Sequence, residues 1–109
     1  MKVIFVSGPY SADSTLKEMK NVIDALMAAE KLWEKGWAVI CPHGNSMLMN
    51  GEWEMFIRGC MELVKRSDAM VMIGDWKQSK GAMIEYNVAR KLGIPIYYSV
   101  EDVPYAEKS

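Results

Sequence analysis

The sequence predicts an α/β fold in which helices cover both faces of a parallel sheet. Short apolar runs alternate along the chain with longer stretches of helical periodicity. The runs are apolar at consecutive positions, which is typical of strands that are buried on both faces. Alternating strands and helices favour right-handed crossovers and therefore parallel neighbours. We predict a three-layer, flavodoxin-like fold with four or five strands, formed by residues 1–109 as a single domain.

The first half of the chain predicts a strand, a helix and a second strand. Residues 3–6 are an apolar run that stops at Ser7-Gly8-Pro9. A helix follows, with Thr15 and Glu18 as a capping box and Gly36 at its end. Apolar residues recur on it at helical spacing, at Leu16, Met19, Ile23, Leu26, Met27 and Trp33. Residues 37–41 form the second strand, which Pro42 ends.

The second half repeats this alternation. Asn50 is the expected N-cap of a helix with an apolar stripe at Trp53, Phe56, Ile57, Cys60 and Val64. Residues 69–73 form the third strand. Residues 79–92 form a helix that Gly93 closes, and residues 95–98 form the fourth strand.

Composition excludes several classes of protein. The net charge is −1 and charges of both signs are interspersed, so no basic stripe is present to follow a nucleic-acid polymer. The four apolar residues after Lys2 are too few for a signal peptide or a membrane span. We therefore expect a cytoplasmic protein with neither nucleic acid nor membrane as a partner. Cys41, His43 and Cys60 lack the spacing of a zinc site, and we expect neither a metal nor a cofactor.

A carboxylate falls among apolar positions of the helix over residues 79–92. At about 100° per residue, Glu85 lies within an arc formed by Ile84, Val88, Gly81, Leu92, Ala89 and Ala82. Ala82 and Ala89, one turn away on either side, are small, so the carboxylate faces a space that a ligand could fill. A buried carboxylate is costly unless paired, which makes it a candidate functional group in a cleft. Alternatively, Glu85 lies at the helix edge and reaches water, or pairs with a lysine.

Residues 67–98 carry the pattern W-x-x-S-x-G-A-x-x-E-x-x-x-A, formed by Trp76, Ser79, Gly81, Ala82, Glu85 and Ala89. With Ser7-Gly8-Pro9-Tyr10 after the first strand, this pattern resembles the nucleoside 2-deoxyribosyltransferase family, especially its short branch. The resemblance spans nearly the whole chain. It implies that Glu85 is the nucleophile that attacks C1′ of a deoxyribose, and that the protein forms a homodimer or a higher homo-oligomer. A carboxylate suits this reaction because it stabilises and traps an oxocarbenium-like sugar.

Within this resemblance, Ser79 separates two activities. The family's nucleoside transferases tend to carry an aspartate at this position, whereas its nucleoside 5′-monophosphate N-glycosidases carry a serine. A serine at a helix start can donate to a phosphate beside free backbone N–H groups, and Lys80 adds a cation. Alternatively, Ser79 is only an N-cap, although both roles can coexist.

Other residues are candidates for binding the substrate. The resemblance places the loop after the first strand at the sugar and phosphate, and the residues expected there are Gly8, Tyr10, Ser11 and Gly81. Asp75 follows the third strand and could orient the sugar hydroxyls or the nucleophile, and His43 lies just beyond the second strand and could face the base. The alternatives are structural: Tyr10 packs on the first helix, Asp75 forms a turn, and His43 lies on the surface. Residues 47–56 are rich in Met and aromatic side chains, and form either a lid over the base or a subunit interface.

Cys60 departs from the family, which commonly has an aspartate there to hold the substrate and manage the proton of the leaving base. A thiol is a weak donor and mostly neutral at pH 7, so this departure weighs against efficient catalysis. Because Cys60 lies within an apolar stripe, a buried structural cysteine is the favoured interpretation.

The leading hypothesis is an N-glycosidase that acts on a 2′-deoxynucleoside 5′-monophosphate, a small-molecule partner. Transfer of the sugar between bases is its variant. A second class is a non-catalytic protein that binds a nucleotide on the same scaffold. A phosphoacceptor receiver module shares the fold, but residues 5–8 lack the acidic side chains that its magnesium site needs.

Overall fold

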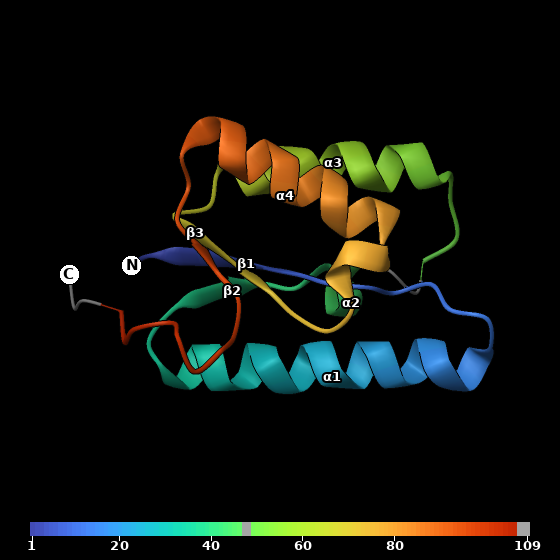
Figure 1. Ribbon diagram of the computed structural model, residues 1–109, viewed down its shortest axis with the longest axis horizontal. Coiled ribbons are helices and arrows are strands. Elements are labelled where there is room, and N and C mark those ends of the chain that lie inside the picture. The colour runs from blue at the N-terminus through green and yellow to red at the C-terminus, as the bar shows by residue number, and fades with distance from the viewer. Residues whose placement is uncertain (47–48, 107–109) are drawn as a thin grey trace.

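The computed structural model describes residues 1–46 and 49–106. It contains a parallel sheet of four strands between two layers of helix (Figure 1). The strands are β1 (Val3–Ser7), β2 (Ala38–Ile40), β3 (Ala69–Met72) and β4 (Ile96–Tyr97), in the order β2-β1-β3-β4. The predicted three-layer α/β fold is confirmed, with four strands.

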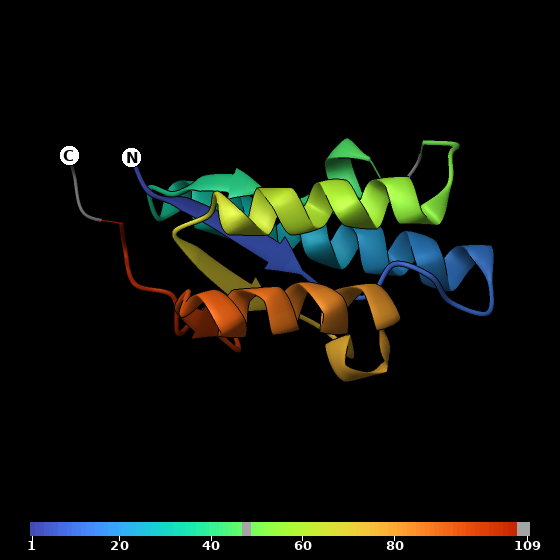
Figure 2. The same ribbon diagram turned by 90° about the horizontal axis from the view of Figure 1, so that it is seen from above.

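Three long helices cover the sheet. They are α1 (Thr15–Glu34), α3 (Trp53–Lys65) and α4 (Lys80–Leu92). Helices α3 and α4 run side by side over one face, and α1 covers the other (Figures 1 and 2). Two short helices, α2 (Pro42–Asn45) and η1 (Trp76–Gln78), were not expected, because one turn is too short to produce a periodic pattern. Across the described residues, no helix combines the length and apolar character needed to cross a bilayer.

Alternate residues of the strands build two separate cores. Ile4 and Val6 of β1 pack with Leu32 of α1 on one face of the sheet. Phe5 points to the opposite face, where it packs with Val64 of α3 and Ala89 of α4. Because successive side chains of a strand alternate between faces, both faces of β1 are buried, as the continuous apolar runs predicted.

Two of the expected helix starts are shifted. The N-cap of α1 is Ser14, whose Oγ accepts from the Lys17 N–H at 3.2 Å, and not Thr15. Glu18 accepts from the Ala12 N–H at 3.4 Å, so its partner lies outside the predicted capping box. The N-cap of α3 is Glu52, which makes no side-chain cap, so the expectation for Asn50 was also wrong. A cap depends on the backbone angles of one residue, and neighbouring polar residues compete for it.

Helix α4 begins and ends where the sequence predicted. Ser79 is its N-cap, and the Ser79 Oγ accepts from the Ala82 N–H at 3.2 Å. Gly93 ends the helix with a φ of 71°, a left-handed conformation that glycine adopts without steric cost.

Helix α1 contacts the sheet through its small residues. Its buried side consists of Ala25, Ala28, Ala29 and Leu32. The apolar residues whose spacing predicted the helix lie on its outer side instead: Leu16, Met19, Ile23, Leu26, Met27 and Trp33. Their exposed fractions run from 44% to 82%. The helix is therefore apolar on two sides. The outer side stays largely exposed, although Leu26 lies beside Gly44 of α2.

The segment after β4 returns to the end of α1. The Lys35 Nζ donates to the carbonyls of Val100 at 2.9 Å and Val103 at 2.6 Å. The Trp37 indole N–H donates to the Pro104 carbonyl at 2.8 Å. These contacts hold the segment in place, so that Val103 packs in the same core as Ile4, Val6 and Leu32.

Leu32→Ala should lower the free energy of unfolding by about 2–5 kcal/mol, because it leaves a cavity in the α1 core. Leu92→Ala is the matched control, since Leu92 is also helical but 53% exposed, whereas Leu32 is 0% exposed. Urea unfolding followed by circular dichroism measures both. Equal losses would contradict the core assignment.

Candidate active site

A cleft of about 750 Å³ opens at the carboxyl ends of the strands. In Figure 1, β1 runs toward this end of the molecule, and the N-termini of α1, α3 and α4 lie at the same end. The β1–α1 loop contributes Gly8, Pro9, Tyr10, Ser11 and Ala12, and α1 contributes Lys17, Lys20 and Asn21. Helix α3 and the chain before it contribute Ser46, Met49, Gly51, Trp53, Phe56, Ile57 and Cys60. The segment from the end of β3 into α4 contributes Asp75, Gln78, Ser79, Lys80, Gly81, Ala82 and Glu85.

Glu85 lines this cleft although its side chain is almost fully buried. Its exposed fraction is 3%. The Ser7 hydroxyl donates to Glu85 Oε1 at 2.7 Å. Ser7 reaches the carboxylate because it lies two residues after Phe5, and both side chains therefore point to the α4 face of the sheet. Neither alternative for Glu85 holds, since the side chain is not exposed and its partner is a hydroxyl instead of a lysine.

The surroundings of Glu85 favour its protonated form. Burial raises the pKa of Glu85 from its ordinary value of 4.5 to about 7, against the lowering effect of hydrogen bonds from Ser7 and Cys60. Burial and the neighbouring Glu85 carboxylate raise the pKa of the Cys60 thiol to about 12. Cys60 thus stays protonated at neutral pH and acts as a donor to Glu85. Its burial agrees with the structural interpretation of this cysteine.

The lining of the cleft also includes groups that attract anions. The start of α4 faces it through Ser79, Lys80 and Gly81, and the first N–H groups of a helix have no partner inside the helix. Because the Ser79 Oγ accepts from Ala82, the hydroxyl proton of Ser79 is left to donate elsewhere. Lys17 and Lys20 line the cleft from α1. This arrangement of cations and a helix N-terminus suits a phosphate.

The loop after β1 is fixed by packing and hydrogen bonds. A Cβ on Gly8 would lie 2.5 Å from Ile73 Cγ1, so the close approach of these two strand ends requires glycine. The Asn21 side-chain amide donates to the Tyr10 carbonyl at 3.0 Å. These contacts hold Tyr10 and its neighbours against α1 and set one wall of the cleft.

His43 lies elsewhere than either sequence interpretation placed it. The side chain is 1% exposed and does not line the cleft. Its Nε2 lies 2.9 Å from the Pro9 carbonyl, which can only accept, so this nitrogen donates. Burial lowers the pKa of His43, against the raising effect of the contact with the Pro9 carbonyl, and so favours a neutral ring. A neutral ring that carries its proton on Nε2 makes this contact. His43 supports the loop from behind, and the expectation that it faces the base is corrected.

The cleft brings together seven of the eight expected site residues: Gly8, Tyr10, Ser11, Asp75, Ser79, Gly81 and Glu85. Four further residues were missed, namely Ser7, Lys17, Lys20 and Asn21. The two-residue alternation after Phe5 could have indicated Ser7, whereas the α1 residues depend on how the helix is rotated against the sheet. Part of the expected lid, Met49, Gly51, Trp53 and Phe56, lines the cleft, while Met47 and Leu48 lie outside the described residues. Within residues 1–46 and 49–106, no group of three or more His, Cys, Asp or Glu is arranged to hold a metal.

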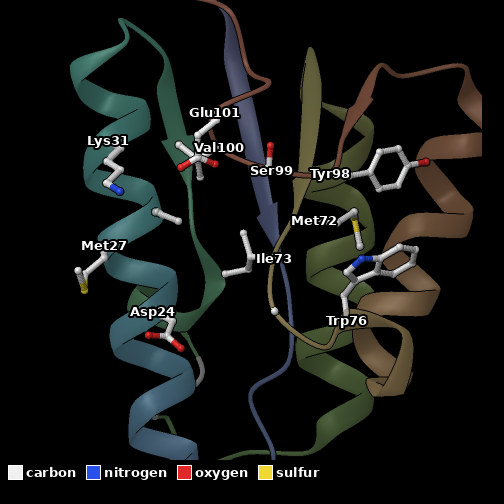
Figure 3. Close-up of a pocket in the computed structure, with 12 residues that line it drawn as sticks. Asp24, Met27, Lys31, Met72, Ile73, Trp76, Tyr98, Ser99, Val100 and Glu101 are labelled. Atoms are coloured by element: carbon white, nitrogen blue, oxygen red, sulfur yellow. The ribbon is translucent and has the colours of Figure 1, made fainter.

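A second, smaller hollow lies beside α1 (Figure 3). Its volume is about 390 Å³. Asp24, Met27 and Lys31 of α1 border it on one side, and Trp76 and Tyr98 border it on the other (Figure 3). No helix of the described chain covers β3 and β4 here, because α1 is the only long helix on this face of the sheet (Figure 1).

A protein-family model described as "Domain of unknown function (DUF4406)" matches residues 2–98. The chain belongs to this family. No match was found among curated proteins. Among solved structures, a 2-deoxyribosyltransferase from the psychrotolerant bacterium Bacillus psychrosaccharolyticus is similar, with a TM-score of 0.62 and 23% identity over 86% of this chain and 69% of the transferase. A conserved protein from Enterococcus faecalis V583 is also similar, with a TM-score of 0.60 and 21% identity. The match covers 88% of this chain and 61% of the Enterococcus chain. The expected resemblance to 2-deoxyribosyltransferases is thus confirmed at the level of the fold.

Glu85→Gln should stabilise the protein increasingly as the pH rises. Between the ordinary pKa of 4.5 and about 7, the folded protein keeps a proton on Glu85 that the unfolded chain has lost. The wild type therefore loses stability across this window, on the order of 3 kcal/mol in all, and glutamine avoids the loss. Urea midpoints at pH 5, 6, 7 and 8 measure the gap between the two proteins.

Glu62→Gln is the control for this experiment. Glu62 is exposed, and the guanidinium of Arg66 lowers its pKa, so it titrates below the window. Its effect on stability should stay constant from pH 5 to 8. If the difference in urea midpoint between Glu85→Gln and the wild type does not grow with pH, the burial of an ionisable carboxyl is contradicted.

Proposed function

We propose that this protein is an N-glycosidase that cleaves the base–sugar bond of 2′-deoxynucleoside 5′-monophosphates, with Glu85 as the nucleophile. The observation that carries the proposal is a nearly buried carboxylate in a cleft that is also lined by a helix N-terminus and three lysines. A substrate with an electrophilic sugar carbon and an anionic phosphate has the matching chemistry.

In this proposal Glu85 attacks C1′ as the bond from C1′ to the base nitrogen breaks. The base leaves with the bonding electrons and takes up a proton, and the sugar becomes an ester of Glu85. Water then attacks C1′, which releases the sugar phosphate and restores the carboxylate. The Ser7 and Cys60 donors hold the carboxylate in place, since both hydrogen-bond to it.

Ser79 and the start of α4 would hold the phosphate. The hydroxyl proton of Ser79 is available, because its oxygen accepts from Ala82 at 3.2 Å. The ammonium group of Lys80 lies 4.9 Å from the centre of the Trp53 ring, which keeps it beside the cleft. Lys17 and Lys20 line the cleft from α1, where they pair with Asp13 at 2.9 Å and with Asp24 at 2.8 Å. These groups support a monophosphate over an uncharged nucleoside.

The remaining residues of the cleft would bind the sugar and the base. Asp75 is proposed to orient the sugar hydroxyls, and Tyr10 to shape the wall beside them. Trp53 and Phe56 present aromatic surface on which a planar base can stack. Gly8, Ser11 and Gly81 complete the sugar and phosphate side of the cleft.

Two other functions have support from particular observations. The fold shared with a 2-deoxyribosyltransferase supports transfer of the sugar to a second base instead of water. Cys60 supports a non-catalytic nucleotide binder, because the residue that hydrogen-bonds Glu85 from α3 is a thiol that stays protonated and cannot act as an acid near neutral pH. Recovery of intact nucleotide after tight binding would favour this second function.

Incubation with matched nucleosides and 5′-monophosphates, ribo and deoxy, should release free base most rapidly from a deoxynucleoside monophosphate. Glu85→Gln should lower this rate by roughly 10³-fold or more, because an amide cannot form the ester. Below about pH 7 the wild-type kcat/KM should fall, since protonation of Glu85 removes the nucleophile. Chromatography of the free base measures each rate, and Glu62→Gln should match the wild type. Base release by Glu85→Gln at the wild-type rate would overturn the mechanism.

Ser79→Asp should shift preference from monophosphates toward unphosphorylated nucleosides. Aspartate remains a competent N-cap but places negative charge where the phosphate would bind. The measurement is the ratio of kcat/KM for a deoxynucleoside 5′-monophosphate to that for its nucleoside, which should fall about tenfold or more.

Ser14→Asp makes the same change at the N-cap of α1, which does not line the cleft, and should leave the ratio unchanged. If Ser79→Asp alters both substrates equally, Ser79 is only a cap and the monophosphate assignment loses its support.

A further inference from the structure

Two residues that the proposed function uses for different parts of the substrate are in contact with each other. The Lys80 Nζ lies over the Trp53 ring, 4.9 Å from its centre. Both side chains line the cleft. The proposed function needs the ammonium group of Lys80 at the phosphate and the ring of Trp53 under the base. The two side chains therefore cannot keep this contact while both serve the substrate.

The contact follows from the way in which α3 packs on α4. A Cβ on Gly81 would lie 3.6 Å from Ile57 Cδ1, so the two helices approach closely at this point. Trp53 lies four residues before Ile57 and therefore on the same side of α3, one turn earlier. Lys80 directly precedes Gly81. The packing of the helices thus brings the first residue of α3 beside the first residue of α4.

Lys80 is the lysine of the cleft that a phosphate can recruit at the lowest cost. Lys17 and Lys20 each pair with an aspartate. In the part of the chain that the structure describes, no carboxylate pairs with Lys80, and the ring of Trp53 is its neighbour instead. A cation over an exposed indole is held weakly, because water competes for the ammonium group. A phosphate competes far better, since it offers charged acceptor oxygens.

A phosphate at the start of α4 would lie beside the backbone of the same lysine. Ser79 accepts from the Ala82 N–H through its Oγ at 3.2 Å and from the Met83 N–H through its carbonyl at 3.0 Å. The N–H groups of Lys80 and Gly81 come earlier and have no acceptor inside the helix. An anion on these two groups is within the range of the long, flexible Lys80 side chain. The ammonium group can therefore leave the indole for the phosphate.

We propose that Lys80 couples phosphate binding to base stacking on Trp53, an inference that rests on the proposed function. Before phosphate binds, the ammonium group covers the face of Trp53 that is turned toward the start of α4. A bound phosphate draws the ammonium group away and exposes this face. The base approaches from the same side, because the sugar joins it to the phosphate. A monophosphate thus opens its own base site, whereas an unphosphorylated nucleoside must displace the ammonium group without compensation.

The coupling is small, positive and reciprocal. Removing an ammonium group from an exposed indole changes a dissociation constant about two- to fivefold. The sign is positive because each ligand removes the contact that the other must also remove. Thermodynamic linkage requires that phosphate favour the base and that the base favour phosphate by one and the same factor.

NMR titrations of the whole chain test the coupling in the absence of any reaction. Free adenine, cytosine and thymine are the probes for the base, and inorganic phosphate is the probe for the anion. In the wild type, saturating phosphate should lower the dissociation constant of a bound base about two- to fivefold. The base should lower the dissociation constant of phosphate by the same factor. Chloride keeps the ionic strength constant, because screening alone would change phosphate binding.

Two variants separate the partners of the contact. Lys80→Ala should tighten base binding about two- to fivefold and make it independent of saturating phosphate, because no ammonium group covers the ring. Trp53→Leu should tighten phosphate binding by the same factor, because Lys80 no longer has to leave an indole. A purely structural role of either residue predicts weaker binding instead. Circular dichroism checks that both variants are folded.

Lys77→Ala is the matched control. The Lys77 Nζ also lies over an indole, 5.6 Å from the centre of the Trp76 ring, but Lys77 does not line the cleft. This variant should leave both dissociation constants and their coupling as in the wild type.

Base and phosphate that bind independently to the wild type would overturn the coupling and leave the proposed function intact. Weaker base binding by Lys80→Ala would overturn it as well, because the ammonium group would then support the base site instead of covering it. If neither probe binds, the proposed function fails and the coupling fails with it. The two failures are therefore distinguishable.

Discussion

The hydrogen bond from Ser7 to Glu85 joins the end of β1 to the middle of α4 at 2.7 Å, and the cleft depends on it. A carboxyl group placed under two helices loses most of its hydration, and it is tolerated only when donors replace the lost water. Ser7 can be such a donor because β1 lies next to β3 at the centre of the sheet, directly beneath the α3–α4 layer. Cys60 supplies a second donor from α3. Ala82 and Ala89 are small enough to let α4 approach the sheet closely. The position of the Glu85 carboxyl therefore depends on strand order, helix packing and residue size together.

Two groups of residues in the cleft differ in electrostatic character. The floor keeps a proton on Glu85 up to about pH 7, because burial outweighs the two donors. The lining also includes Lys17, Lys20 and Lys80 and the N-terminal end of α4. A phosphate would be attracted by the N-terminus of α4 and by Lys80, while the sugar would lie over the carboxyl that we propose as nucleophile. Such a division places charge recognition away from the reacting atoms, and it suits a molecule with one anionic end.

Helix α1 combines two tasks that usually belong to different helices. Its alanine side packs on the sheet, and its larger apolar residues face outward. The same helix carries Lys17, Lys20 and Asn21 into the cleft. One helix therefore both covers a face of the sheet and forms one wall of the cleft.

The sequence by itself determined the alternation of strands and helices along the chain and the parallel sheet, because these depend on local periodicity and on short apolar runs. It placed Glu85 among apolar positions but left open whether the side chain is buried or lies at the helix edge. The end of α4 was also predictable, since Gly93 adopts a left-handed φ of 71°. Local pattern could not place His43, which donates to Pro9 across a separation of 34 residues. Local pattern also could not decide which side of α1 faces the sheet. Hydrophobicity favoured the side with the large apolar residues, but the small alanines pack against the sheet because they allow a closer approach. These features were decided only by the tertiary structure, because they depend on the shapes of surfaces that meet from distant parts of the chain.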